Sequence, residues 1–161
     1  MPDHEDLDVL PLDTRPLVLV VEDEVTPRSI VTRMVRTLGY RAGSCPGGAA
    51  ALRLLRETPG VSLVLADLGM PRMDGGELAE RIWDFNPRIP VALMAGRGDG
   101  HVDDLRAGYA DLPFIAKPVA LGDLAELLFV LLGPPAPLTP APKSMGRVSA
   151  RRRPSDQKKV P

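Results

Sequence analysis

Short apolar runs alternate with segments of helical periodicity along most of the chain, and this alternation limits the possible folds more than any other feature. Four runs rich in aliphatic and β-branched residues and one weaker run predict strands, at 17–21, 61–66, 89–94 and 112–116, and at 40–45. Apolar side chains recur at helical spacing between and after them, at 30–38, 49–56, 77–85, 103–107 and 121–132. Strands that alternate with helices indicate a parallel sheet with helices on both faces.

The predicted fold is therefore α/β, a doubly wound five-stranded parallel sheet of the flavodoxin-like type with the strand order 2-1-3-4-5. Such sheets bind their ligands outside the carboxyl ends of the strands, where the strand order reverses. The residues that directly follow each strand are consequently the first candidates for a functional site.

Proline and charge divide the chain into three parts. Seven of its 18 prolines lie in residues 133–161, and this segment has a net charge of +6, whereas residues 1–142 have a net charge of −7. A segment of that composition cannot bury a core, so we expect a disordered Pro-rich basic tail over 133–161. A disordered arm is expected over 1–16, and one folded domain over 17–132.

Several protein classes are excluded by composition. No apolar run approaches the roughly 18–20 residues that span a bilayer. The acidic N-terminus lacks the features of a secretory signal. The single cysteine, Cys45, cannot form an intramolecular disulfide or a cysteine-based metal site. A cytoplasmic protein is expected.

Charged residues follow three of the predicted strands. Glu22 and Asp23 come after the first, Asp67 after the third and Lys117 after the last. Strands one and three are neighbours in the predicted order, and carboxylates brought together there repel one another unless a cation lies among them. Mg²⁺ suits such oxygen ligands. A carboxylate, a metal ion and a lysine are suited to phosphoryl transfer onto the carboxylate.

Each of these residues also has a simpler interpretation. Glu22 and Asp23 can belong, with Glu24, to an acidic cluster at a helix N-terminus that the helix dipole stabilises. Asp67 can be an ordinary loop residue, and Lys117 a solvated turn lysine. Their occurrence at successive predicted strand ends favours the functional interpretation.

Three segments together resemble the receiver domain of bacterial two-component response regulators. They are Val-Val-Glu-Asp-Glu at 20–24, Asp-Leu-Gly-Met-Pro-Arg-Met-Asp-Gly at 67–75 and Lys-Pro at 117–118. The resemblance covers about residues 17–132, and the segment 67–75 is its most specific part. It implies a receiver of the single-domain type.

The resemblance also implies a role for each residue of the motifs. Asp67 is expected to accept a phosphoryl group from a kinase phosphohistidine, and Lys117 to contact the phosphoryl oxygens. Asp23, Asp67 and the backbone carbonyl of Gly69 are expected to bind Mg²⁺ directly, and Glu22 through water or hydrogen bonds. The bond between Lys117 and Pro118 is expected to be cis.

One position departs from the family pattern. Ala95 stands where the family has a Thr or Ser, whose hydroxyl binds a phosphoryl oxygen and draws the loop after strand four inward. The backbone N–H groups of Leu68 and Gly96 are expected to bind phosphoryl oxygens still. Phosphorylation should therefore persist, with weakened switching at Ala95 and at Phe114, the aromatic residue that changes rotamer on activation. The lost bond is worth roughly 1.5–3 kcal/mol.

The last helix and the tail raise the question of partners. The last helix, 121–132, is apolar on all sides over residues 127–132, so Leu127 and Val130 should be exposed on a monomer. Either the tail covers them, or two copies of the chain pair through this helix. The tail's Arg151–Arg153 and Lys158–Lys159 could contact nucleic acid, but no aromatic residue is present there for base stacking. An intramolecular or solubilising role is favoured.

The leading hypothesis is a stand-alone receiver in a Mg²⁺-dependent phosphorelay. A sensor or hybrid histidine kinase would donate the phosphoryl group, and an unidentified downstream protein would receive the signal. Such a protein promotes only its own phosphorylation and dephosphorylation and is not a turnover enzyme. The alternative is a pseudo-receiver, which binds partners without phosphorylation. A hydrolase of the haloacid-dehalogenase type is disfavoured, because it needs a second Asp where this chain has Gly69.

Overall fold

The computed structural model describes residues 13–96 and 100–135, and it confirms the predicted sheet. Five parallel strands lie in the order β2-β1-β3-β4-β5. The strands are β1 Leu17–Val21, β2 Arg41–Cys45, β3 Val61–Asp67, β4 Val91–Ala95 and β5 Phe114–Ala116. The helices are α1 Val25–Thr37, α2 Gly48–Glu57, α3 Gly75–Phe85, α4 Gly100–Gly108 and α5 Leu121–Leu132.

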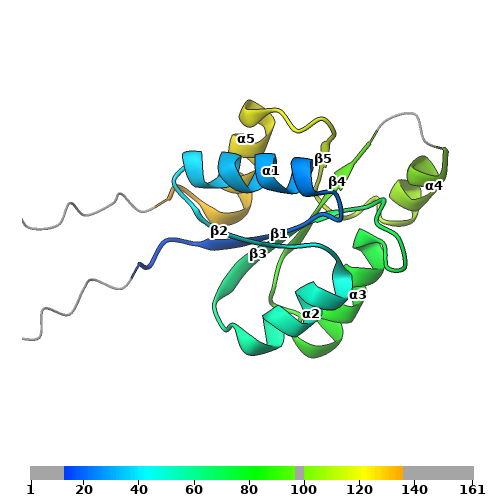
Figure 1. Cartoon of the computed structure of the whole chain (residues 1–161), viewed down its shortest axis with the longest axis horizontal. Helices are drawn as coiled ribbons and strands as arrows, with labels where there is room; N and C mark the ends of the chain where they lie inside the picture. Colours follow the sequence, from blue (N-terminus) through cyan, green and yellow to red (C-terminus); the bar gives the residue numbers. More distant parts are fainter. Residues whose placement is uncertain (1–12, 97–99, 136–161) are drawn as a thin grey trace, which may run out of the picture.

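The helices cover both faces of the sheet (Figure 1). Helices α1 and α5 pack on one face against Val18, Val20 and Leu65, and α2 and α3 pack on the other against Leu19 and Val64. Successive side chains of a strand point to opposite faces, and here both faces are buried. This double burial explains why β1, β3 and β4 are continuously apolar rather than alternating, whereas the edge strand β2, with the sequence Arg-Ala-Gly-Ser-Cys, is only partly buried.

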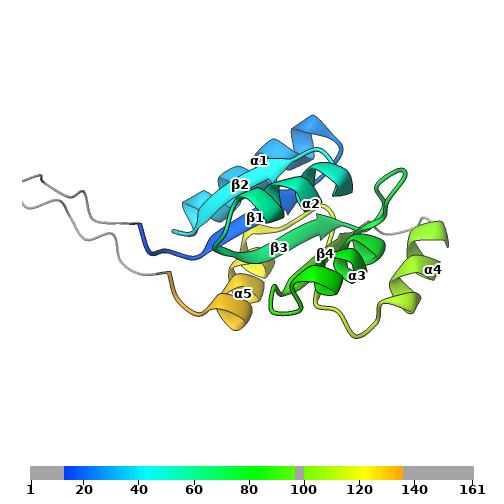
Figure 2. The ribbon, with the colours of Figure 1, turned by 90° about the horizontal axis from the view of Figure 1, so that it is seen from below.

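Helix α4 lies apart from the other helices, beside the carboxyl ends of the strands (Figure 2). Among its described residues, Val102 is the buried one. Both ends of the described chain leave at the opposite side of the molecule (Figure 1). The first and last described residues therefore lie away from the carboxyl ends of the strands.

The element boundaries differ from the sequence prediction at several points. Strands β4 and β5 each begin two residues later than predicted, directly after Pro90 and Pro113. Proline cannot donate to the sheet, although the Pro90 carbonyl still accepts from the N–H of Val64 at 3.0 Å. Helix α1 begins five residues earlier than predicted. It includes Pro27, which is tolerated because a helix's first turn has no partner for that N–H.

The apolar surface of α5 also differs from expectation. Val130 is 72% exposed, as predicted, but Leu127 is half-buried against the core. Phe129, at 59%, is instead the second large apolar side chain exposed near the end of the helix. Within the described residues, no helix is long and apolar enough to cross a membrane.

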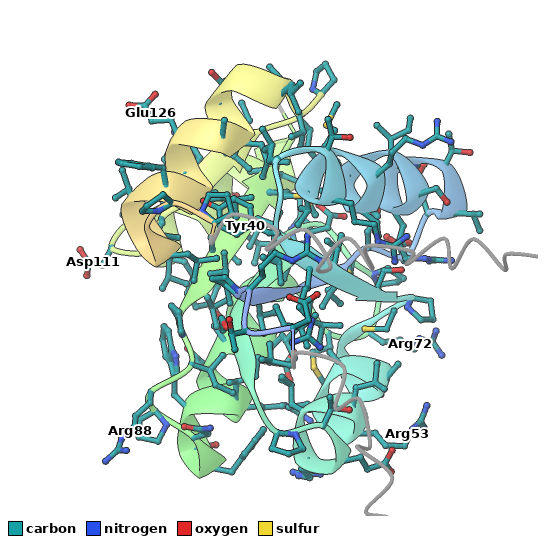
Figure 3. The ribbon with its side chains drawn as sticks, turned by 90° about the vertical axis from the view of Figure 1, so that its left-hand side faces the viewer. Tyr40, Arg53, Arg72, Arg88, Asp111 and Glu126 are labelled. Atoms are coloured by element: carbon teal, nitrogen blue, oxygen red, sulfur yellow. The ribbon has the colours of Figure 1, made fainter. Side chains whose placement is uncertain are left out.

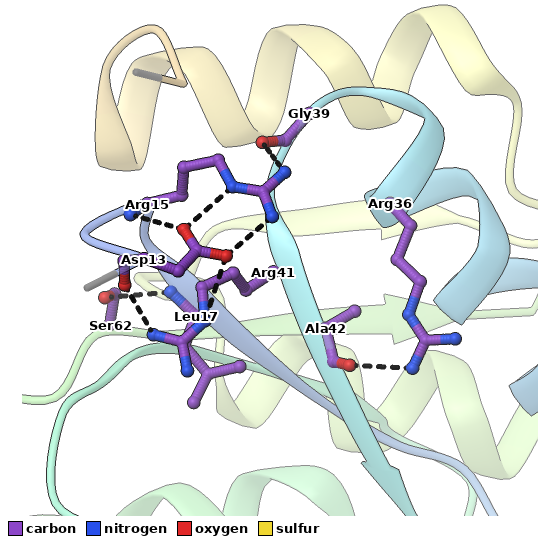
Figure 4. Close-up of polar contacts among 8 residues, drawn as sticks. All are labelled: Asp13, Arg15, Leu17, Arg36, Gly39, Arg41, Ala42 and Ser62. Carbon is purple, nitrogen blue, oxygen red and sulfur yellow. Dashed lines mark hydrogen bonds and ion pairs between the residues drawn. The ribbon is translucent and has the colours of Figure 1, made fainter. Parts of the chain in front are cut away.

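Most of the predicted arm and tail lies outside the described residues, but the parts adjoining the domain contact it. Asp13 lies in an ion pair with Arg15 at 2.6 Å and near Arg41 at 3.8 Å (Figure 4). At the other terminus, the hydroxyl of Tyr40 donates to the carbonyl of Gly133 at 2.7 Å. Tyr40 lies between the sheet and the end of α5 (Figure 3).

We expect the Asp13 carboxyl to titrate well below its ordinary value. The hydrogen bond from Arg15 lowers the pKa of Asp13 from 3.8 to about 2. A carboxyl whose pKa is lower in the folded state stabilises the fold above its unfolded value, and this contribution is lost as the pH falls through about 2. A carbon-detected NMR titration should give a pKa of about 2 for Asp13 in the native chain and one near 3.8 in Arg15→Met. An identical titration in the two proteins would contradict the assignment.

Candidate functional site

Three acidic side chains meet at the carboxyl ends of β1 and β3. The two strands are neighbours, with Val21 paired to Ala66, so Glu22, Asp23 and Asp67 emerge side by side. One carboxylate oxygen of each lies within 4.8 Å of the others. Glu22 is fully buried and Asp67 is 6% exposed, whereas Asp23 is more accessible. The strand order thus brings together the three residues that the sequence placed at strand ends.

Lys117, which directly follows the edge strand β5, reaches the same cluster. Its Nζ lies 2.8 Å from Oε2 of Glu22 and 3.3 Å from Oδ1 of Asp67. The backbone N–H of Lys117 donates to the carbonyl of Ala95 at 2.8 Å, which anchors the residue beyond the end of β4. The peptide bond between Lys117 and Pro118 is cis, as the resemblance implied.

The ionisation of Glu22 and Lys117 reflects their burial and their pairing. Burial raises the pKa of the Glu22 carboxyl, against the opposing effect of the hydrogen bond from Lys117. Burial acts to lower the pKa of the Lys117 ammonium, but the contacts with Glu22 and Asp67 outweigh it, so that pKa is raised. The lysine is therefore held charged between two carboxylates.

This donor set fits a divalent cation. Three carboxylates within 4.8 Å face a single ammonium group, so the cluster retains excess negative charge. Oxygen-only ligands of this kind are those that Mg²⁺ takes in proteins. Glu22, Asp23 and Asp67 are the side chains that could hold the ion. The role of the Gly69 carbonyl stays a prediction.

Two backbone donors near Asp67 already have partners within the protein. The N–H of Leu68 donates to the carbonyl of Met94 at 2.8 Å, as part of the pairing between β3 and β4. It is therefore engaged by the sheet rather than turned to the carboxylate. The N–H of Gly69 instead donates to Oδ1 of Asp67 at 3.3 Å. The N–H of Gly69 is thus a further backbone donor beside Asp67, and the phosphoryl-binding roles expected of Leu68 and Gly96 stay predictions.

Ala95 and Phe114, the positions expected to take part in switching, lie on neighbouring strands. Ala95 ends β4, is 3% exposed and pairs with Ala116 of β5. Phe114 begins β5 and is 41% exposed, with the guanidinium carbon of Arg106 lying 3.8 Å from the centre of its ring. In this structure the aromatic side chain is therefore directed outward and covered by an arginine of α4.

Two structural contributors to the site were missed at the sequence level. A Cβ at Gly75 would lie 2.7 Å from the backbone oxygen of Asp67, so only glycine allows α3 to begin this close to the carboxylate-bearing residue. Arg28 donates from Nη1 to the carbonyls of Glu22 and Asp23. Gly75 belongs to the segment 67–75 that carries the resemblance, but its sequence context alone indicates only a turn, and Arg28 reads as an exposed helix arginine.

Arg72, in the loop after Asp67, has a strained backbone. Its φ is +66°, a left-handed conformation that costs ordinary L-residues roughly 1–2 kcal/mol. Its side chain points away from the molecule (Figure 3), so substitution should act through the backbone. Asn tolerates this conformation, and we expect Arg72→Asn to raise the free energy of unfolding by about 0.5–1 kcal/mol. Arg72→Val should lower it by a similar amount. Urea unfolding checks both, and the same sign for the two variants would contradict the backbone argument.

Comparison with known proteins yields one consistent family. The model of the response regulator receiver domain matches residues 18–129. The chain is 31% identical over 116 residues to the two-component response regulator ORR5 of Oryza sativa, covering 70% of this chain and 85% of that protein. It is 31% identical over 109 residues to the response regulator receiver protein CpdR of Brucella abortus, covering 68% and 90%.

The other similarities agree with these. The transcriptional regulatory protein ZraR of Klebsiella oxytoca is 36% identical over 104 residues, which cover 63% of this chain but only 23% of ZraR. Among solved structures, a response regulator receiver protein from Pseudomonas putida has a TM-score of 0.62 at 28% identity, over 71% of this chain and 95% of that one. A receiver domain protein from Clostridium thermocellum has a TM-score of 0.64 at 22% identity, over 72% and 93%, and supports the fold alone.

Proposed function

Because this chain belongs to the family of response regulator receiver domains, we propose that it acts in a phosphorelay, with Asp67 as the phosphoacceptor. The donor is the phosphohistidine of a sensor or hybrid histidine kinase, and a downstream protein receives the signal. The observation that carries this proposal is the joint position of Lys117, 3.3 Å from Asp67, and of the three carboxylates within 4.8 Å of one another.

The proposed reaction places the phosphoryl group on an oxygen of Asp67. A carboxylate oxygen attacks phosphorus, the phosphorus–nitrogen bond of the donor breaks, and the histidine leaves with the bond's electron pair. The product is an aspartyl phosphate. Lys117 offsets negative charge on the phosphoryl oxygens, and the N–H of Gly69 lies where it can donate to one of them. Bound Mg²⁺ would add positive charge beside those same oxygens.

The direct test is phosphorylation of the purified full chain with acetyl phosphate and Mg²⁺, followed by intact mass spectrometry. We expect a gain of one phosphoryl group that is absent in Asp67→Asn and in the presence of EDTA. Asp111→Asn should leave the gain unchanged, because it makes the same kind of change at an exposed residue before β5, at the opposite end of that strand from Lys117. Phosphorylation that persists in Asp67→Asn would refute the assignment of the phosphoacceptor.

The alternative of a pseudo-receiver rests on Ala95. Alanine has no hydroxyl to bind the phosphoryl group, so phosphorylation and conformational change could be uncoupled at this position. A folded chain that binds Mg²⁺ but gains no phosphoryl group would favour this alternative. The exposed Phe129 and Val130 of α5 would then be the first residues to examine for pairing between two copies.

A further inference from the structure

Arg28 donates hydrogen bonds to the backbone of the turn that carries Glu22 and Asp23, two of the three acidic residues. It lies in the first part of α1 and is half-buried. Its Nη1 donates to the carbonyl of Glu22 at 2.7 Å and to the carbonyl of Asp23 at 3.3 Å. Both bonds come from one charged nitrogen, and both acceptors belong to residues of the acidic cluster.

We propose that Arg28 is a positioning residue for the cation site, acting through the backbone of Asp23. The proposal rests on the proposed function. The carbonyl of Glu22 belongs to the peptide group before the Asp23 Cα, and the carbonyl of Asp23 to the one after it. A group that holds both peptides restricts the backbone on either side of that Cα. It thereby restricts the direction of the Asp23 side chain.

The other hydrogen bonds of this turn hold Glu22 and Glu24, the residues on either side of Asp23. The N–H of Glu22 donates to the carbonyl of Cys45 at 3.2 Å, and the Glu22 carboxylate is paired with Lys117. The N–H of Glu24 donates to Oε1 of Glu22 at 3.2 Å. Glu22 is therefore fixed from three sides. Asp23 is the most exposed carboxylate of the cluster, so fewer side chains pack around it. The two hydrogen bonds from Arg28 to the carbonyls on either side of the Asp23 Cα hold its backbone in place instead.

The chemistry of arginine suits this task. Its guanidinium stays charged at all ordinary pH values and presents donors in a rigid plane. In this structure Arg28 bonds carbonyl oxygens, whereas Lys117 bonds carboxylate oxygens of Glu22 and Asp67. Arg28 can therefore orient a cation ligand without occupying the carboxylate oxygen that the cation needs. Partners of this kind typically change metal affinity by about 10–100-fold when removed.

The test measures the dissociation constant of Mg²⁺ by calorimetry on the full chain without a phosphodonor. We expect Arg28→Met, which retains the aliphatic stem but no donor, to raise that constant about 10–100-fold. Arg28→Lys, which retains the charge but not the planar geometry, should give an intermediate value. The matched control is Arg33→Met, an exposed arginine of the same helix, which makes the same change in net charge and should bind Mg²⁺ as the native chain does.

A second readout distinguishes positioning from chemistry. In the acetyl phosphate assay, Arg28→Met should need more Mg²⁺ for half-maximal rate but should reach the native rate at saturating Mg²⁺. A purely structural role would lower the fraction of folded protein without shifting this Mg²⁺ dependence. A maximal rate that stays low would mean that Arg28 acts on the reacting atoms.

The outcomes separate the two proposals. If the native chain binds no Mg²⁺ and gains no phosphoryl group, the proposed function fails and this inference fails with it. If the native chain does both and folded Arg28→Met binds Mg²⁺ equally well, only this inference is overturned. An equal loss in Arg28→Met and Arg33→Met would also overturn it, in favour of a general charge effect. Should Arg28→Met fail to fold, native affinity in Arg28→Lys would overturn the inference, and reduced affinity would support it.

Discussion

Lys117→Ala is expected to lower the rate of phosphorylation by acetyl phosphate about 10²–10³-fold at saturating Mg²⁺, the usual effect of removing one preorganised charge at a reaction centre. Lys117 lies 3.3 Å from Oδ1 of Asp67, and burial and pairing hold its side chain in place. The incoming phosphoryl group adds negative charge to a cluster that already contains three carboxylates. Without the ammonium group, that charge would be less well compensated.

Rates from intact mass spectrometry at several times would check this expectation. Arg81→Ala is the matched control, because it removes one positive charge from a surface ion pair with Glu77. Its effect should be small, since exposed pairs contribute little. A native rate in folded Lys117→Ala would mean that Asp67 is phosphorylated without the help of this residue.

Ala95→Thr is expected to strengthen the conformational response to phosphorylation. The new hydroxyl can donate to a phosphoryl oxygen, a bond to a charged group worth roughly 1.5–3 kcal/mol. That energy shifts an equilibrium between two conformations about 10–150-fold, which is comparable to typical allosteric couplings. The native chain, with a methyl group at this position, should respond less completely.

NMR spectra with and without a beryllofluoride phosphoryl mimic would measure this response. We expect larger shifts at Gly96 and Phe114 in Ala95→Thr than in the native chain. Ala95→Val is the matched control, because valine has the shape of threonine without its hydroxyl and tests whether added volume at this buried site is responsible. Large shifts in the native chain, or equal shifts in the Val and Thr variants, would contradict the argument.

A change at Phe114 also has to overcome a contact that the sequence did not predict. The side chain of Arg106 lies over the exposed ring, with its guanidinium carbon 3.8 Å from the ring centre. Such contacts contribute about 0.5–1 kcal/mol at exposed sites. Inward movement of the ring therefore loses this stabilisation, which adds to the effect of Ala95.

Much of the site could be predicted from the sequence because its residues lie at or next to the ends of the predicted strands. Apolar runs and helical periodicity located the strands. Asp67 is the last residue of β3, Glu22 and Asp23 are the first two residues after β1, and Lys117 directly follows β5. Parallel strands bring such residues to one edge, so their meeting required only the strand order. The element boundaries were less accurate, because prolines and first-turn residues shift them by a few positions without changing the periodicity.

The sequence by itself determined the class of the sheet, the residues at its carboxyl edge and the absence of a hydroxyl at Ala95, since each depends on residue type and spacing. Only the tertiary structure decided that the N–H of Leu68 is engaged by Met94, that Gly69 supplies the donor beside Asp67, and that Arg28 holds the turn around Asp23. The physical reason is that a hydrogen bond depends on distances and angles between particular atoms, which the packing of sequence-distant strands sets. A small shift of the chain leaves a residue as buried as before, but it changes which atoms are close enough to form a hydrogen bond.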